Sequence, residues 1–169
     1  MNATSKNKFS TLFLDRDGVI NHRVKGYISS DKDFNFIDGV LHSVSKTNIL
    51  FDKIIIITNQ QGIGKGLMTV TDLNMIHDQM IDTINKHGGR IDRIYYCPHL
   101  ISENCECRKP KIGMFNQSKL EFPEIDFKES FFIGDSDSDM EAARLAGIKF
   151  IRVSSDYSLS DWVDSIKVD

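Results

Sequence analysis

Several aspartates of this sequence stand directly after apolar runs, at positions where a strand would end. They are Asp15, Asp17, Asp135, Asp137 and Asp139. Carboxylates packed together repel one another unless a cation neutralises them, and Mg²⁺ prefers a few carboxylates together with water and a substrate phosphate. Aspartate and glycine also favour solvated turns, so one such loop alone would carry little weight. Because another polar segment follows a third apolar run, from Thr58 onward, the pattern favours a magnesium site beside a phosphate.

The spacing of Asp15 and Asp17 has a chemical interpretation of its own. In an extended segment, alternate residues point the same way, so both carboxylates can face one reacting group. One can then attack while the other acts as general acid and base. A carboxylate that attacks phosphorus forms an aspartyl-phosphate, and Thr58 and Lys109 offer a hydroxyl group and a positive charge to a phosphoryl oxygen. We therefore expect Asp15, Asp17, Thr58 and Lys109 to be catalytic.

A second group of chemistry-bearing residues contains every cysteine of the chain. The three cysteines lie between residues 97 and 107, whereas a disulfide framework would spread them along the chain. Three thiolates and one imidazole fit a closed tetrahedral Zn²⁺ site, formed here by Cys97, His99, Cys105 and Cys107. Three buried free cysteines beside an incidental histidine are the alternative. A zinc ion here would fix the loop that leads into Arg108 and Lys109.

These residues need a scaffold, and the hydrophobic pattern indicates which one. Apolar runs predict strands, and stretches with a period near 3.6 residues predict helices. The runs cover residues 9–14, 53–58, 93–96, 130–133 and 149–153, and the helical patterns cover 39–50, 71–87, 114–121 and 137–146, with a further helix around Trp162. Thr71 is a candidate N-cap. This alternation predicts an α/β fold with a mostly parallel sheet, in which ligands bind at the carboxyl ends of the strands.

The composition is that of an ordinary globular domain. The chain has 169 residues, 40% of them hydrophobic and 27% charged, and its net charge is 21 − 24 = −3. This charge argues against a protein that binds nucleic acid or anionic membranes through bulk charge, and no apolar run approaches the roughly 18 residues of a membrane span. Residues 1–10 are polar and lack the apolar stretch of a signal peptide. We therefore expect a cytoplasmic monomer with no membrane or nucleic-acid partner.

Four segments resemble the sequence motifs of the haloacid dehalogenase superfamily of phosphohydrolases. They read LFLDRDGVIN, IIIITNQQGIGKG, CECRKPKIGM and FFIGDSDSDMEAA. More narrowly, DRDGVIN, TNQQGI, YYCPH and CECRKP resemble the D-glycero-D-manno-heptose 1,7-bisphosphate phosphatase family, with the histidinol-phosphate phosphatases as close relatives. The resemblance implies one Rossmann-like phosphatase domain over residues 1–169. It also implies a zinc-bound loop and no large cap domain, because core elements largely fill the intervals between the motifs.

The resemblance also implies a role for each matching residue. Asp15 would be the nucleophile, and Asp17 would protonate the leaving oxygen and then deprotonate water. Mg²⁺ would bind Asp15, the backbone carbonyl of Asp17 and Asp135, with Asp139 supporting this site from behind. Thr58 and Lys109 would steady the phosphoryl group. The residues expected to contact substrate are Arg16, Arg23, Val24, Lys25, Gly26, Tyr27, Asn59, Gln60, Gln61 and Arg108.

Several functions are compatible with these residues. The leading hypothesis is a Mg²⁺-dependent phosphatase that removes the 7-phosphate of a heptose 1,7-bisphosphate, a small phosphorylated substrate. Histidinol-phosphate phosphatase is the alternative within the same class, and a DNA 3′-phosphatase lacks the expected basic composition. A zinc-loop interaction module without catalysis would leave the aspartates, Thr58 and Lys109 without a purpose. Of the other residues, His22 is equally compatible with substrate contact and a plain surface position, whereas His42, His77 and His87 are expected to face solvent.

Overall fold

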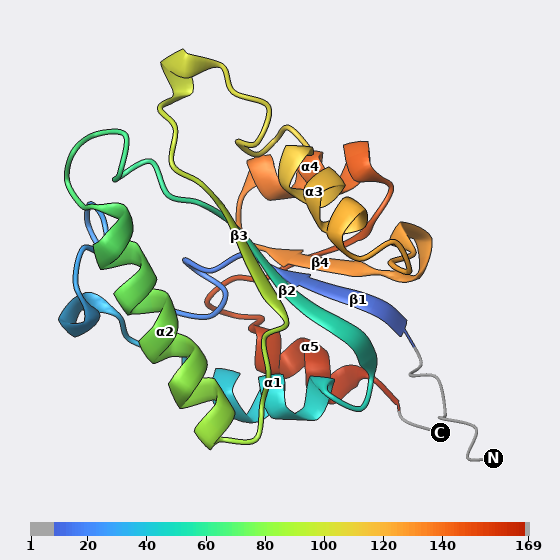
Figure 1. Ribbon diagram of the computed structural model, residues 1–169. Helices are drawn as coiled ribbons and strands as arrows, with labels where there is room; N and C mark the ends of the chain where they lie inside the picture. Colours follow the sequence, from blue (N-terminus) through green and yellow to red (C-terminus); the bar gives the residue numbers. More distant parts are fainter. Residues whose placement is uncertain (1–8, 168–169) are drawn as a thin grey trace.

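A parallel sheet forms the centre of the protein in the computed structural model, which describes residues 9–167 (Figure 1). Its strands are β1 (Phe9–Leu14), β2 (Phe51–Asn59), β3 (Arg93–Cys97), β4 (Phe131–Gly134) and β5 (Lys149–Arg152). All neighbouring strands pair in parallel, in the order β3-β2-β1-β4-β5. The predicted α/β fold is thus confirmed. The chain passes from β1 to one side of the sheet and later returns to the other side at β4, so the switch point lies between β1 and β4, where ligands commonly bind.

Helices cover both faces of this sheet and produce three layers (Figure 1). One face packs against α1 (Val40–Thr47), α2 (Val70–Lys86) and α5 (Leu159–Ser165), and the other against α3 (Gly113–Glu121) and α4 (Asp137–Ala146). Short 3₁₀ helices, η1 (Asp31–Asp33), η2 (Ile101–Glu103) and η3 (Phe127–Glu129), lie in the connections. Among the described residues, only loops and η1 lie between β1 and α1, so no cap domain is inserted there.

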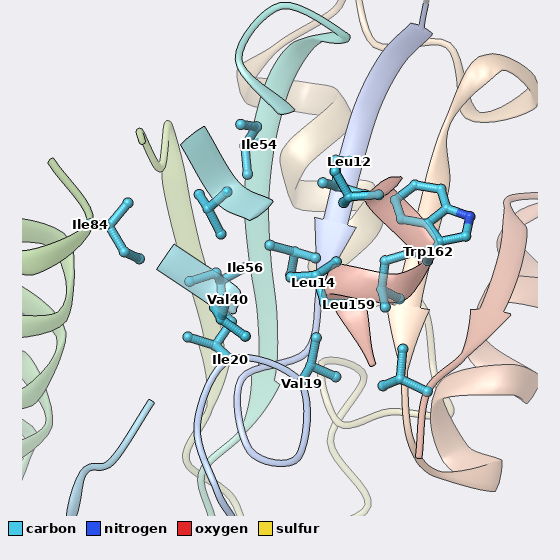
Figure 2. Close-up of a cluster of buried hydrophobic side chains, with 14 of the residues drawn as sticks. Leu12, Leu14, Val19, Ile20, Val40, Ile54, Ile56, Ile84, Leu159 and Trp162 are labelled. Carbon is cyan, nitrogen blue, oxygen red and sulfur yellow. The ribbon is translucent and has the colours of Figure 1, made fainter. Parts of the chain in front are cut away.

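The isoleucines of β2 pack into the hydrophobic cores on both faces of the sheet. Successive side chains of a strand point to opposite faces. Ile54 and Ile56 accordingly join the core under α1, α2 and α5, while Ile55 and Ile57 join the core under α3 and α4. Figure 2 shows Ile54 and Ile56 on the same face as Trp162. All four isoleucines are fully buried, and each such side chain contributes about 1.5–3 kcal/mol.

Helices α2, α4 and α5 start at capping boxes, in which a side chain at the N-cap and one at the third helical position satisfy each other's backbone N–H groups. Helix α4 starts with Ser136 and Asp139, which fixes the latter next to the switch point. Helix α2 starts with Thr69 and Asp72. The predicted N-cap Thr71 is therefore wrong by two residues, because only Thr69 has an acidic residue three positions ahead.

The sequence led us to expect no membrane-spanning segment and a cytoplasmic location. Among residues 9–167, no helix combines the length and the apolar character that a membrane crossing requires. The expectation of a cytoplasmic location rests on residues 1–10, of which residues 1–8 lie outside the described part of the chain.

Candidate active site

Three carboxylates meet at the switch point between β1 and β4. Asp15 follows β1, Asp135 follows β4, and Asp139 lies in the first turn of α4. One carboxylate oxygen from each lies within 4.8 Å of the other two. Gly18 permits this approach, because a Cβ atom there would lie 2.0 Å from Oδ2 of Asp135. Burial raises the pKa of Asp15 to about 7, although the positive charge of Lys109 acts in the opposite direction. A further positive charge at this site would therefore stabilise the carboxylate form of Asp15.

Lys109 supplies part of that charge from a buried position. Its Nζ lies 2.9 Å from Oδ1 of Asp15 and 2.6 Å from Oδ1 of Asp139, and it donates to the backbone carbonyl of Ile57 at 2.9 Å. Burial alone would lower the pKa of Lys109, but the charges of Asp15 and Asp139 outweigh it and raise the pKa. Asn59 holds the Lys109 backbone through two hydrogen bonds of 3.0 and 3.2 Å. The ammonium group is therefore fixed, charged and next to Asp15.

Asp17 is held as a carboxylate by donors on several sides. Arg16 donates to both of its oxygens at 2.9–3.2 Å, while Asn21 and Gln60 each donate at 2.9 Å. Burial alone would raise the pKa of Asp17, but the charge of Arg16 and these hydrogen bonds hold the pKa below its ordinary value. The side chain keeps 23% of its surface exposed. Asp17 thus faces a cavity while its position is fixed from behind.

That cavity has a volume of about 290 Å³. Residues from the loops after β1, β2 and β4 and from the loop before α3 line it. They are Asp15, Asp17, Arg23, Val24, Gly26, Tyr27, Ile28, Asn59, Gln60, Gln61, Arg108, Lys109, Ser136, Ser138 and Asp139. Arg23 also binds Asp135 with two hydrogen bonds of 2.6 and 2.7 Å. One terminal nitrogen of Arg108 is buried without a hydrogen-bond partner among the described residues. The cavity therefore joins carboxylates at its base to arginines that can bind an anion.

The predicted zinc ligands also come together, at the end of β3 and in the loop that follows. The sulfur atoms of Cys97 and Cys107 each lie 3.5 Å from that of Cys105, and Nδ1 of His99 lies 3.2 Å from the Cys107 sulfur and 3.6 Å from the Cys97 sulfur. Zn–S bonds of about 2.3 Å at tetrahedral angles place sulfur atoms roughly 3.8 Å apart. Burial raises the pKa values of the Cys97 and Cys107 thiols, so a cation would be needed for these two cysteines to act as thiolates.

Comparisons with known proteins agree with this geometry. The family model described as polynucleotide kinase 3 phosphatase matches residues 11–167. A D-glycero-alpha-D-manno-heptose-1,7-bisphosphate 7-phosphatase of Campylobacter jejuni is 45% identical over 145 residues, which cover 83% of this chain and 80% of that protein. The chain belongs to the heptose bisphosphate phosphatase family of the haloacid dehalogenase superfamily. It is a phosphoric monoester hydrolase.

Other members of the family show how far the likeness extends. A D-glycero-beta-D-manno-heptose-1,7-bisphosphate 7-phosphatase of Helicobacter pylori strain J99 is 41% identical over 139 residues, covering 82% of this chain and 79% of that protein. The crystal structure of the D,D-heptose 1,7-bisphosphate phosphatase of B. bronchiseptica, complexed with magnesium and phosphate, is 27% identical. It superimposes with a TM-score of 0.84 and covers 92% of this chain and 96% of that one.

Both metals expected for this phosphatase family have a fitting set of ligands in this chain. The oxygens of Asp15, Asp135 and Asp139 form the all-carboxylate set that suits Mg²⁺. The side chain of Asp17 is bound to Arg16, Asn21 and Gln60 instead, so its predicted share in the metal site would be left to its backbone carbonyl. The four atoms of the cysteine–histidine cluster lie within 4.8 Å of one another, as Zn²⁺ requires.

Four of the residues predicted for catalysis, magnesium or substrate lie outside the lining of the cavity. Arg16, Lys25, Thr58 and Asp135 do not line the cavity. Lys25 is exposed, and Thr58 is buried under Gln60, which donates to its hydroxyl at 2.9 Å. Arg16 is only 1% exposed, and its guanidinium group faces Asp17 and the interior. In this structure Arg16 therefore lies away from the cavity lining, because the motif position specifies the backbone but not the direction of this side chain.

His77 is a polar residue of this site that the sequence prediction missed. It is 5% exposed and lies 3.2 Å from Arg16, so the expectation that it faces solvent is wrong. A signal was present, because positions 73, 76, 77, 80 and 84 share the apolar stripe of α2 at helical spacing. A histidine within such a stripe is buried, and a buried imidazole needs a polar partner.

Proposed function

We propose that this phosphatase removes the 7-phosphate of a D-glycero-D-manno-heptose 1,7-bisphosphate through an aspartyl-phosphate on Asp15, with Mg²⁺ as cofactor. The observation that supports this most is the arrangement around the cavity. A buried carboxylate and a fixed ammonium group lie at the base of the cavity, and Arg108 lines it with one nitrogen unpaired. A substrate with one phosphate at the base and a second at Arg108 matches these charges.

The first half-reaction transfers the phosphoryl group. An oxygen of Asp15 attacks phosphorus, an Asp15–phosphorus bond forms, and the bond from phosphorus to the sugar oxygen breaks. Asp17 gives a proton to that oxygen, which leaves as an alcohol. The low pKa of Asp17 in the free protein must rise for this step, and the arrival of a phosphate dianion beside it has that effect through like-charge repulsion.

The second half-reaction returns the protein to its starting state. Asp17, now a carboxylate, takes a proton from a water molecule that attacks phosphorus. The bond between phosphorus and Asp15 breaks, inorganic phosphate is released, and Asp17 gives its proton to solvent as its pKa falls below the ordinary value again. Lys109, which lies 2.9 Å from Asp15 in the free protein, would stabilise the negative charge of the phosphoryl oxygens. Mg²⁺ bound by Asp15, Asp135 and the Asp17 carbonyl, with Asp139 behind, would neutralise charge on the transferred group.

A substrate panel tests this proposal. The two anomers of heptose 1,7-bisphosphate, histidinol phosphate and a 3′-phosphorylated oligonucleotide should be compared by phosphate release. Chelation with EDTA followed by Mg²⁺ should remove and restore activity. We expect the highest kcat/KM on a heptose bisphosphate. Higher kcat/KM on histidinol phosphate or on the oligonucleotide would overturn the proposed substrate, and full activity after chelation would overturn the metal dependence.

Replacing Arg108 with alanine should separate substrate recognition from chemistry. Its guanidinium group can bind a second phosphate with two parallel hydrogen bonds. We expect Arg108→Ala to raise KM for the bisphosphate, with a loss of about 1.5–3 kcal/mol in binding, the usual scale for a hydrogen bond to a charged group. A small aryl phosphate offers this side chain nothing to hold, so its kcat/KM should hardly change. Equal losses on both substrates would assign Arg108 to the loop or to the chemistry.

Replacing Cys105 with serine tests the zinc cluster independently of activity. Cys105 lies 3.5 Å from both other cysteine sulfurs, so its loss opens the tetrahedral set. We expect Cys105→Ser to lose stoichiometric zinc, measured by elemental analysis, and to become more sensitive to proteolysis within residues 98–108, because metal binding and loop folding are coupled. The wild-type protein, purified in parallel, should hold one equivalent. Full zinc content in the variant would show that the ligand assignment is wrong.

A further inference from the structure

A buried chain of polar side chains extends from Asp17 away from the cavity. Arg16 binds Asp17 through Nε and one terminal nitrogen, and the same terminal nitrogen lies 3.3 Å from Oε1 of Gln60. Gln60 in turn donates to Asp17 and to Thr58 at 2.9 Å. The other terminal nitrogen of Arg16 lies 3.2 Å from Nε2 of His77. The series therefore connects the carboxylate at the cavity to helix α2.

The chemistry of these groups fixes the state of the imidazole. A guanidinium group only donates hydrogen bonds and stays charged in proteins. Nε2 of His77 must therefore accept from Arg16, which places the ring proton on Nδ1. Burial, together with the charge of Arg16, lowers the pKa of His77 to about 3. His77 is a neutral acceptor at the pH at which such a phosphatase works.

Apolar and aromatic side chains pack around Arg16 and His77. His77 lies on α2 next to Ile76, which belongs to a small core cluster with Leu73, Ile28 and Met68. The ring of Tyr96 meets the imidazole at 6.2 Å between centroids. Phe34 lies against the other partner, with its ring centroid 5.9 Å from the Arg16 guanidinium carbon. Both Arg16 and His77 are therefore buried, at 1% and 5% exposed.

The cost of burying a guanidinium group explains why Arg16 needs His77 as a hydrogen-bond partner. A buried cation with unpaired N–H groups is costly, and a flexible one would let the carboxylate it binds move. Asp17 satisfies one edge of the guanidinium group, and His77 satisfies the nitrogen that points away from Asp17. With both edges bound, the plane of the guanidinium group is fixed, and so is the carboxylate that it holds.

We propose that Arg16 and His77 are positioning residues, which hold Asp17 where it can pass its proton to the leaving oxygen. This inference rests on the proposed role of Asp17 as general acid. Neither residue touches the substrate, since neither lines the cavity. Their effect is on the geometry of proton transfer, in which small displacements of the acid are costly.

The experiment compares two leaving groups. p-Nitrophenyl phosphate releases a stable phenolate that needs little protonation, whereas glycerol 3-phosphate releases an alkoxide that needs the acid. The ratio of their kcat/KM values reports on the first phosphoryl transfer alone, and Asp17→Asn calibrates the ratio. Because general acid catalysis contributes about 10²–10⁴-fold, Asp17→Asn should lower the alkyl-to-aryl ratio within that range, and His77→Leu should lower it about tenfold.

Variants of matched size separate positioning from structural damage. His77→Gln retains a neutral acceptor and should restore most of the ratio, while Arg16→Lys retains the charge but not the two-edged geometry and should lower the ratio. Ile84→Val is the control, a buried change on the same helix in a different core cluster, and should leave the ratio unchanged. Thermal melting of every variant verifies folding.

The outcomes distinguish the positioning role of Arg16 and His77 from the role of Asp17 as general acid. A lower ratio in His77→Leu that His77→Gln restores supports the positioning role. Equal losses on both substrates, or an unchanged ratio in both His77→Leu and Arg16→Lys, would overturn it while the role of Asp17 stands. If Asp17→Asn itself leaves the ratio unchanged, the proposed acid is wrong, and the inference about its positioning residues fails with it.

Discussion

Asp15→Asn should reduce kcat/KM by at least about 10⁴-fold on every phosphomonoester, given that removing a catalytic nucleophile has cost on the order of 10⁶-fold in other enzymes. The amide has the shape of the carboxylate but carries no charge and is a poor nucleophile, so no aspartyl-phosphate forms. Lys109 keeps its second buried partner, because its Nζ lies 2.6 Å from Asp139, so the fold should persist. Activity and thermal melting measured on the same sample test both statements.

An inhibitor and a control variant test whether the loss of activity in Asp15→Asn reflects the loss of the nucleophile. Beryllium fluoride mimics an aspartyl-phosphate and should inhibit the wild-type protein, but it should not bind Asp15→Asn. The control is Asp137→Asn, a change in another motif to an aspartate that is 90% exposed and pairs with Arg152, which should retain normal turnover. Near-normal activity in Asp15→Asn would remove the mechanism proposed for this protein.

The sequence was sufficient for the fold because the hydrophobic pattern is strong. The isoleucines at 54–57 require a strand buried on both faces, and only helices on both sides can bury it. The order of the strands did not follow from periodicity, since neighbouring runs look alike. Helix ends were the other weak point. Helix α1 ends at Thr47 although the apolar pattern continues to Leu50, which the structure places in a turn before β2.

The candidate site was predictable to the extent that strand ends determine it. Asp15, Asp135 and Thr58 follow from the carboxyl ends of their strands, and the spacing of the cysteines and His99 indicated the cysteine–histidine cluster. The direction of Arg16 did not follow, because a residue between two catalytic aspartates faces the interior or the cavity depending on packing elsewhere. That packing comes from α2, more than 50 positions later in the sequence, at His77. Long-range polar contacts of this kind leave no local pattern.

Lys109→Met should damage both the fold and the chemistry. Lys109 is 4% exposed and neutralises Asp15 and Asp139 at 2.9 and 2.6 Å. Removing one partner of a buried ion pair typically costs about 3–5 kcal/mol, because the remaining charges stay buried without compensation. We expect a loss of this size in the free energy of unfolding, measured in urea without added metal. The kcat/KM should fall for all substrates alike, unlike that of Arg108→Ala, because we propose that Lys109 contacts the reacting group.

The response to metal distinguishes electrostatic loss from lost packing in Lys109→Met. If the cost comes from uncompensated carboxylates, Mg²⁺ bound to them should stabilise the variant more than the wild-type protein, since a ligand that binds only the folded state raises its stability. The matched control is Lys111→Met in the same loop, whose partly exposed ammonium group binds Glu106 and Asn104 and whose loss should change stability less, because it leaves no buried charge without a partner. Equal stabilisation of Lys109→Met and wild type by Mg²⁺ would mean that the buried lysine acts through packing. In that case the carboxylates at the switch point would not depend on Lys109 for their charge balance.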